Sequence, residues 1–160
     1  MCNISMSIPM RPFVESLPMA LLGAREATMQ RFRPMLAEFG LTEQQWRVLR
    51  ALASADQPLE VGRVADRTEL LPPSVSRIVA RLADDGLIER STVEHDLRRA
   101  TLRLTRKGRG LVTRVAPHSE RIYGEIEAAF GADRLARLLA ELHDLATIAD
   151  ARAEQAREAS

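Results

Sequence analysis

The spacing of apolar residues along the chain predicts a mostly helical protein. Over 17–39 the apolar positions recur at intervals of three, four or seven residues, as on one face of an α-helix. Gly40 follows and suits a helix C-terminus, while Pro34 is expected to bend this helix or to remove one hydrogen bond. The expected buried stripe consists of Leu22, Met29, Phe32, Leu36 and Phe39.

Further helices are predicted along the rest of the chain. Thr42 is expected to be an N-cap, because Gln45 stands three residues later in the arrangement of a capping box. The helix that it begins is expected to run to about Ala55 and to bury Trp46, Leu49, Leu52 and Ala53. The remaining predicted helices cover 59–69, 72–85, 105–130 and a last segment that carries Leu135, Leu138, Leu139, Leu142, Leu145 and Ala149.

One stretch between the helices has the pattern of two strands. Residues 87–93 read as the first strand, and the alternating segment 100–104 reads as the second. The charged residues 94–99 between them are expected to form the turn of a β-hairpin. Three short helices, a hairpin and a long helix make up a winged helix-turn-helix arrangement. The fold class is therefore mostly α with a small β-hairpin.

Charge is balanced overall but not along the chain. The 160 residues carry a formal net charge of +1, whereas 61–109 hold eleven Lys and Arg against seven Asp and Glu. A basic middle segment is suited to contact with a polyanion such as DNA. No apolar run approaches the ~20 residues of a membrane span, and the first residues do not resemble a secretory signal, so a cytoplasmic protein is expected.

Residue types that support catalysis or metal binding do not cluster. Cys2 is the single cysteine, and His95, His118 and His143 share no metal-ligand spacing with acidic residues. The sequence also has no Gly-rich phosphate loop and no nucleophile elbow. Neither an enzyme nor a cofactor is expected.

The helix predicted over 72–85 exposes small hydroxyls and arginines beside its apolar stripe. Ser side chains adapt to several base edges, and Arg pairs with guanine in the major groove. The hairpin tip places two arginines on a narrow projection, a shape that reaches a minor groove. The predicted DNA contacts are Ser74, Ser76, Arg77, Arg81, Asp96, Arg98 and Arg99.

Several of these residues lie in segments that resemble the MarR (multiple antibiotic resistance regulator) family. The resemblance extends from about Leu17 to Ala149, and its carrying segments are 74–90, 96–98 and 104–108. The family's wing motif is Asp-any-Arg at a fixed spacing before the Thr that opens the next helix, and Asp96, Arg98 and Thr105 match it. Arg99 departs from the small residue that is common there, so which arginine enters the groove stays open. Segments 20–27, 32–34 and 41–50 are similar to members that regulate aromatic-acid degradation.

Arg25 is the main candidate for recognising such an acid. It falls on the apolar stripe of the first helix, where a charge is costly unless it is paired. It therefore either binds a ligand carboxylate, pairs with an acidic residue across a dimer, or extends its charged end to solvent. The predicted ligand-binding set is Arg25, Met29, Trp46 and His118.

Taken together, these patterns predict a DNA-binding homodimer, and the resemblance implies that it is a repressor of an aromatic-compound operon. It is expected to bind a pseudo-palindromic operator on double-stranded DNA and to be released by a small aromatic acid. The expected organisation is an arm over 1–15 and one domain over 16–160, with a DNA-binding lobe over about 41–108. The dimerisation helices are expected over about 17–39 and 105–156.

Two alternatives stay open at this point. One is a regulator of the same family that senses oxidants through Cys2. The other is a winged helix that binds a protein instead of DNA, which exposed apolar residues over 74–81 would favour. Ser and Arg occupy those positions instead.

Overall fold

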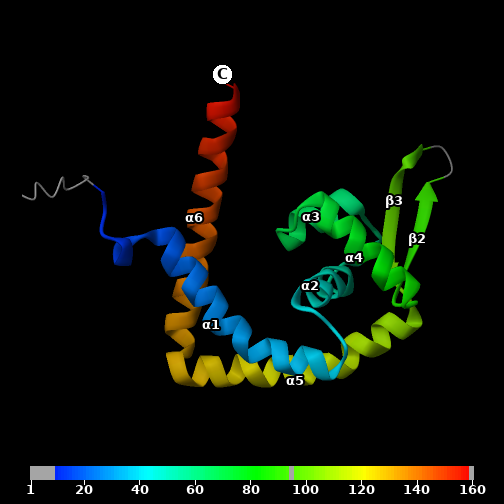
Figure 1. Cartoon of the computed structure of the whole chain (residues 1–160), viewed down its shortest axis with the longest axis horizontal. Coiled ribbons are helices and arrows are strands. Elements are labelled where there is room, and N and C mark those ends of the chain that lie inside the picture. Colours follow the sequence, from blue (N-terminus) through cyan, green and yellow to red (C-terminus); the bar gives the residue numbers. More distant parts are fainter. Residues whose placement is uncertain (1–9, 94–95, 159–160) are drawn as a thin grey trace, which may run out of the picture. The chain divides into compact units, whose positions relative to one another are not determined.

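The computed structural model describes the backbone of residues 10–93 and 96–158 and the side chains of 10–91 and 100–149 (Figure 1). Cys2 and most of the expected arm lie outside the described residues. The helices and strands, in chain order, are the 3-10 helix η1 (Phe13–Glu15), α1 (Leu17–Glu38), α2 (Glu43–Ala53), β1 (Leu59–Glu60), α3 (Val61–Thr68), α4 (Pro72–Asp84), β2 (Ile88–Val93), β3 (Asp96–Leu104), α5 (Arg106–Phe130) and α6 (Ala132–Glu158). The predicted fold class is confirmed.

The chain forms two compact units that meet within α5. The first unit extends to Ala116 and contains the whole predicted DNA-binding lobe, and the second begins at Pro117. Both prolines inside helices, Pro34 and Pro117, are accommodated without ending α1 or α5. Gly40, after α1, has a φ of +68°, which glycine adopts without the steric cost of a side chain.

The small sheet has three antiparallel strands in the order β1-β3-β2. The third strand corrects the sequence-based prediction, which placed Leu59 and Glu60 at the start of a helix. Their backbones instead pair with Leu102 and Thr101 of β3, so these two residues are extended and α3 begins at Val61. This two-residue strand forms because it pairs with a distant strand, so no local sequence pattern predicts it.

The hairpin is also longer than predicted (Figure 1). Residues 96–99 were expected in the turn, but β3 begins at Asp96, and Val93 pairs with Asp96. A register shift between Thr92 and Val93 allows the pairing to continue toward the tip. Asp96, Arg98 and Arg99 therefore belong to a strand, while their side chains lie outside the described part of the chain.

Helix α2 lies at the centre of the first unit and contacts α1, α3, α4 and β3. Its Val48 and Leu49 are completely buried. The prediction that Ala53 is buried is wrong, because α2 buries Val48 instead and Ala53, its last residue, is exposed. Val48 is buried outside the predicted stripe because α2 has neighbours on several sides, and a helix surrounded in this way buries more than one stripe. The expected Trp46, Leu49 and Leu52 are buried.

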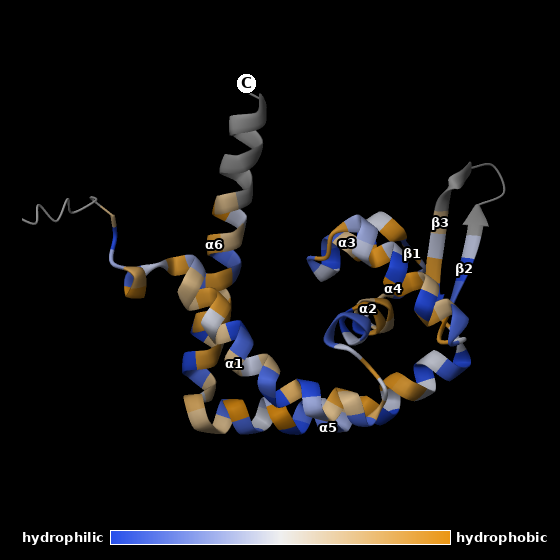
Figure 2. Ribbon diagram, viewed as in Figure 1, coloured by the Kyte–Doolittle hydropathy of each residue, from blue (hydrophilic) through white to orange (hydrophobic). Residues whose placement is uncertain are grey.

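The predicted apolar stripe of α1 is buried only toward the C-terminal end of the helix. Phe32 and Leu36 are in the core, whereas Met29 and Phe39 are half-buried and Leu22 is 54% exposed. Figure 2 shows apolar positions continuing into the first half of α1. Within one chain, that half of the stripe is left open to a further partner.

A tight junction fixes the start of α5 to the end of α4 and the start of β2. The Thr105 hydroxyl donates to the Gly86 carbonyl (2.7 Å) and accepts from the Gly108 N–H (3.0 Å). Lys107 Nζ donates to the Asp85 carbonyl at 2.7 Å. A Cβ at Gly108 would lie 1.9 Å from the Leu87 carbonyl oxygen, so only glycine fits there.

Candidate functional site

Helix α4 separates an apolar face from a polar face. Val75, Val79 and Leu82 are buried, and the helix begins at Pro72 and Pro73, where the missing N–H groups are not needed. The predicted DNA contacts lie on the other side: Ser76, Arg77 and Arg81 are exposed and Ser74 is half-buried. Arg81 Nε lies 3.1 Å from a carboxylate oxygen of Asp85, one turn further on. The helix thus presents hydroxyls and guanidinium groups outward.

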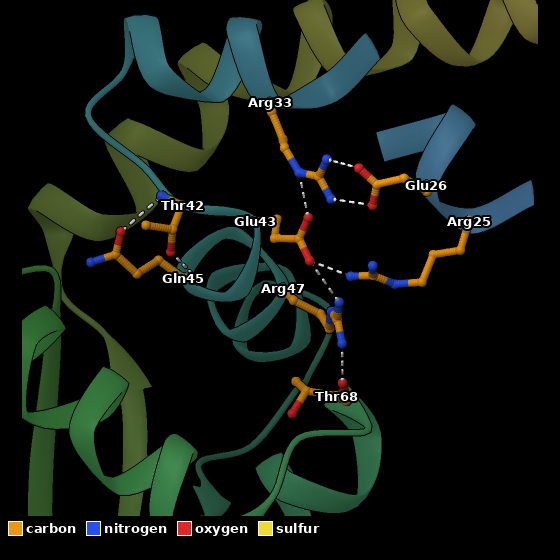
Figure 3. A network of polar contacts seen from close by, with 8 residues as sticks. All are labelled: Arg25, Glu26, Arg33, Thr42, Glu43, Gln45, Arg47 and Thr68. Atoms are coloured by element: carbon orange, nitrogen blue, oxygen red, sulfur yellow. Dashed lines mark hydrogen bonds and ion pairs between the residues drawn. The ribbon is translucent and has the colours of Figure 1, made fainter. Parts of the chain in front are cut away.

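A cluster of ionised side chains joins α1 to α2 (Figure 3). Glu43, the first residue of α2, accepts hydrogen bonds from Arg25 and from Arg33 Nε, the latter at 3.0 Å. Arg33 also forms a two-point contact with Glu26 on its own helix. Arg25 therefore has a carboxylate partner within its own chain, on the next helix.

The same cluster extends to α3 through Arg47. Arg47 Nη2 lies 3.7 Å from Glu43 Oε1, and Arg47 Nη1 donates to the Thr68 carbonyl at 2.9 Å (Figure 3). Thr68 is the last residue of α3, where carbonyls lack partners within the helix. The Glu43 carboxylate thus contacts Arg25 and Arg33 of α1 and, through Arg47, is connected to the C-terminal end of α3.

Opposing effects set the pKa of the Glu43 carboxyl. Burial of this side chain, which is only 9% exposed, would raise the pKa, but hydrogen bonds from Arg25 and Arg33 outweigh it and hold the pKa below its ordinary value. The Glu26 pKa is also lowered, mainly by its hydrogen bond from Arg33. A carboxyl with a lowered folded-state pKa stabilises the fold above its ordinary pKa. That contribution is lost as the pH falls through the lowered value.

Trp46, one turn after Glu43, has an unusual environment. The side chain is 6% exposed, and its indole Nε1–H has no acceptor among the described residues. A buried donor without an acceptor carries a desolvation cost that a bound acceptor would remove.

The other predicted ligand residues are less enclosed. Met29 is half-buried and Arg25 is 44% exposed. His118 was expected on the stripe formed by Leu111, Val115 and Ile122, but it is exposed, and Ser119 is the buried residue at that level of α5. Positions 118 and 119 both fit the spacing, so the sequence alone did not distinguish them.

Sequence reasoning missed Arg33, Glu43 and Arg47 as members of the cluster. The four-residue spacing of Glu43 and Arg47 is a recognisable helical ion pair. The pairing of α1 with α2 has no such signal, because it depends on how the two helices pack. In residues 10–93 and 96–158, no helix is long and apolar enough to cross a membrane. The described His, Asp and Glu residues form no group that could hold a metal ion.

Comparison with known proteins places this site in a family. A sequence profile of the MarR family matches residues 39–99. The homoprotocatechuate degradative operon repressor of Escherichia coli is 37% identical over 140 residues, covering 88% of this chain and 94% of that protein.

Solved structures of regulators are also similar to this chain. The transcriptional regulator PA4135 is 40% identical with a TM-score of 0.79, over 86% of this chain and 98% of that one. The structure of NadR in complex with 4-hydroxyphenylacetate is 34% identical with a TM-score of 0.76, over 88% and 99% of the two chains.

The three helices α2–α4, the polar face of α4 and the β2–β3 hairpin define a winged helix-turn-helix transcription regulator. Together with the matches above, the fold and the polar face of α4 identify this protein as a DNA-binding regulator, as the sequence predicted. The chain belongs to the MarR family.

Proposed function

We propose that this regulator is a homodimeric, cytoplasmic repressor that leaves a pseudo-palindromic operator when it binds a small aromatic acid. The observation that carries DNA recognition is the polar face of α4, opposite its buried stripe of Val75, Val79 and Leu82. Ser74, Ser76, Arg77 and Arg81 on α4 and Asp96, Arg98 and Arg99 on β3 are the proposed contacts. The identity of the E. coli relative as a repressor supports the direction of control.

Exposed apolar residues on α1 and α6 support the dimer. Leu21 and Leu22 of α1 are exposed, as are Leu138, Leu139 and Ile148 of α6. Single exposed leucines are common, but a run of them on long helices marks an interaction surface. A two-fold dimer would present two copies of α4 to half-sites about 10 bp apart.

The proposed effector site is built around Trp46 and Arg25. The buried indole N–H of Trp46 lacks an acceptor in the described part of the chain, and Arg25 supplies a cation that is already bound to a carboxylate, that of Glu43. An aromatic acid offers a ring for the apolar surface and a carboxylate that exchanges with Glu43 for Arg25. Met29, in the same compact unit, is a further proposed contact, and His118, in the second unit, stays a prediction from the sequence. The 4-hydroxyphenylacetate bound to NadR makes hydroxyphenylacetates the first candidates.

The wing is tested by removing its arginines. We expect Arg98→Ala to weaken binding to a palindromic promoter fragment and to lower the salt dependence by about one unit per lost phosphate contact, or about two per dimer. Arg99→Ala is the matched variant, because position 99 lies on the same strand. The measurement is operator affinity over a series of salt concentrations. Wild-type affinity in both variants would show that the wing does not contact DNA.

The effector site is tested at Arg25. We expect Arg25→Ala to keep most of its operator affinity, because Arg33 and Arg47 still contact Glu43. It should lose release by 4-hydroxyphenylacetate, because the ligand carboxylate loses its guanidinium. Arg25→Lys should recover only part of the response, since an ammonium cannot make the two-point contact. The measurement is operator affinity at increasing acid concentration.

Arg33→Ala is the control for this test. Arg33 holds both Glu26 and Glu43, so its loss perturbs the ion-pair cluster without removing the proposed ligand contact. Loss of release in Arg25→Ala but not in Arg33→Ala supports a ligand role. Equal responses of wild type and both Arg25 variants would make Arg25 a structural arginine.

A further inference from the structure

A hollow lies between the start of α2 and the polar face of α4, and we propose that it binds a phosphate group of the DNA backbone. Its volume is about 390 Å³. This would make α2 part of the DNA interface, in addition to α4 and the wing, and it rests on the DNA binding that the family shows. The polar residues that line the hollow are Thr42, Gln44, Gln45, Ser74, Arg77 and Arg81.

The charge of the hollow favours an anion. Among the described residues, its lining includes Arg77 and Arg81 and no Asp or Glu. Arg81 pairs with Asp85, which is outside the lining, but Arg81 is 68% exposed, and an ion pair at such a position is weak and screened by salt. Guanidinium groups bind phosphate oxygens through two parallel hydrogen bonds.

The capping box orients the remaining polar atoms. The Thr42 N–H donates to Gln45 Oε1 (2.9 Å), and the Gln45 N–H donates to Thr42 Oγ1 (3.2 Å). These bonds occupy the two side-chain oxygens as acceptors and leave the Gln45 amide NH₂ and the Thr42 hydroxyl hydrogen to donate. The capping box therefore satisfies the backbone N–H groups of Thr42 and Gln45. The hollow offers side-chain donors, which is what a phosphate requires.

The hollow lies beside the polar face of α4, where a DNA strand would run if α4 entered the major groove. A recognition helix in the major groove has a sugar–phosphate backbone along its flank, and phosphate contacts from Gln, Ser, Thr and Arg fix the register of such a helix. Glu43, which precedes Gln44, is held by Arg25 and Arg33 of α1. The first turn of α2 is thus fixed before DNA arrives, which lowers the cost of ordering the contact.

Gln44 gives the sharpest test, because it is exposed and takes no part in the capping box. We expect Gln44→Glu to weaken DNA binding about tenfold at low salt by placing a carboxylate against a phosphate, and Gln44→Lys to strengthen it similarly. The salt dependence should fall by about one unit per protomer in the first variant and rise by as much in the second. Both effects should be the same on an operator and on an unrelated duplex, because phosphates carry no sequence information.

Gln57→Glu and Gln57→Lys are the controls, since Gln57 is an exposed residue of the turn after α2 and the net charge changes are identical. Glutamate in the first turn of a helix is favourable, so Gln44→Glu should unfold at or above the wild-type temperature, and weaker binding cannot be ascribed to unfolding. Equal effects at positions 44 and 57 would overturn the proposal, as would an effect confined to the operator. Wild-type protein that binds no duplex would instead refute DNA binding itself.

Discussion

Gly108→Ala is expected to destabilise the protein by about 3 kcal/mol, the upper part of the range for forced overpacking. The new Cβ would lie 1.9 Å from the Leu87 carbonyl oxygen and 2.9 Å from its carbon, so the backbone of β2 or α5 must move. For a chain of this size, such a change lowers the melting temperature by about 10 °C. Thermal unfolding followed by circular dichroism measures it.

Gly110→Ala is the matched control on the same helix. There the nearest atom to a Cβ is the end of the Arg114 side chain at 3.8 Å, an ordinary contact. Alanine in place of this helical glycine should raise stability by about 0.5–1 kcal/mol. If Gly108→Ala is as stable as wild type, the junction formed by Thr105, Gly108 and Leu87 is not the rigid connection that the structure describes.

Leu139→Asp is expected to abolish the dimer and operator binding with it. Leu139 is 48% exposed in the single chain, and burying a leucine at an interface contributes roughly 1.5–3 kcal/mol on each side of the two-fold axis. A carboxylate at the same place would have to be desolvated without a partner. Light scattering should give twice 17.8 kDa for wild type and a monomer or aggregate for the variant.

Leu139→Met preserves volume and apolar character and should remain dimeric. A monodisperse monomer of the wild type at micromolar concentration would contradict the dimer. So would a Leu139→Asp protein that keeps its partner and its operator affinity.

What could be predicted from the sequence was local. The capping box of Thr42 and Gln45 depends on four adjacent residues, and it forms as predicted. The stripe predicted for α4 is Val75, Ile78, Val79 and Leu82; it has one helical period, and all of it is buried except Ile78, which is half-buried. Where one short segment contains the whole signal, the sequence is sufficient.

Features that depend on distant partners were not predictable in this way. Strand β1 consists of two residues that are extended because β3 pairs with them about forty positions later. The partner of Arg25 is Glu43, on the next helix, and nothing local connects the two. On α5, His118 and Ser119 both fit the spacing of the stripe, so packing alone decides that Ser119 is buried.

In the proposed function, the ion-pair cluster connects the proposed ligand site with the proposed DNA contacts. Glu43 connects Arg25 of α1 with Arg47, which holds the last carbonyl of α3 at Thr68. An acid that takes Arg25 from Glu43 changes the partners at the start of α2, next to the hollow proposed to bind phosphate. Coupling between the two sites requires the acid to bind the DNA-incompetent state more tightly, by about 1.4 kcal/mol for each tenfold shift.

The most direct test of the proposed function is one titration of the wild-type protein. Fluorescence anisotropy of a labelled promoter fragment should show two protomers per fragment and affinity that falls steeply with salt. Addition of 4-hydroxyphenylacetate should release the fragment, whereas the neutral 4-hydroxyphenylacetamide should not. No binding at low salt, or full occupancy at saturating acid, would contradict an acid-released repressor.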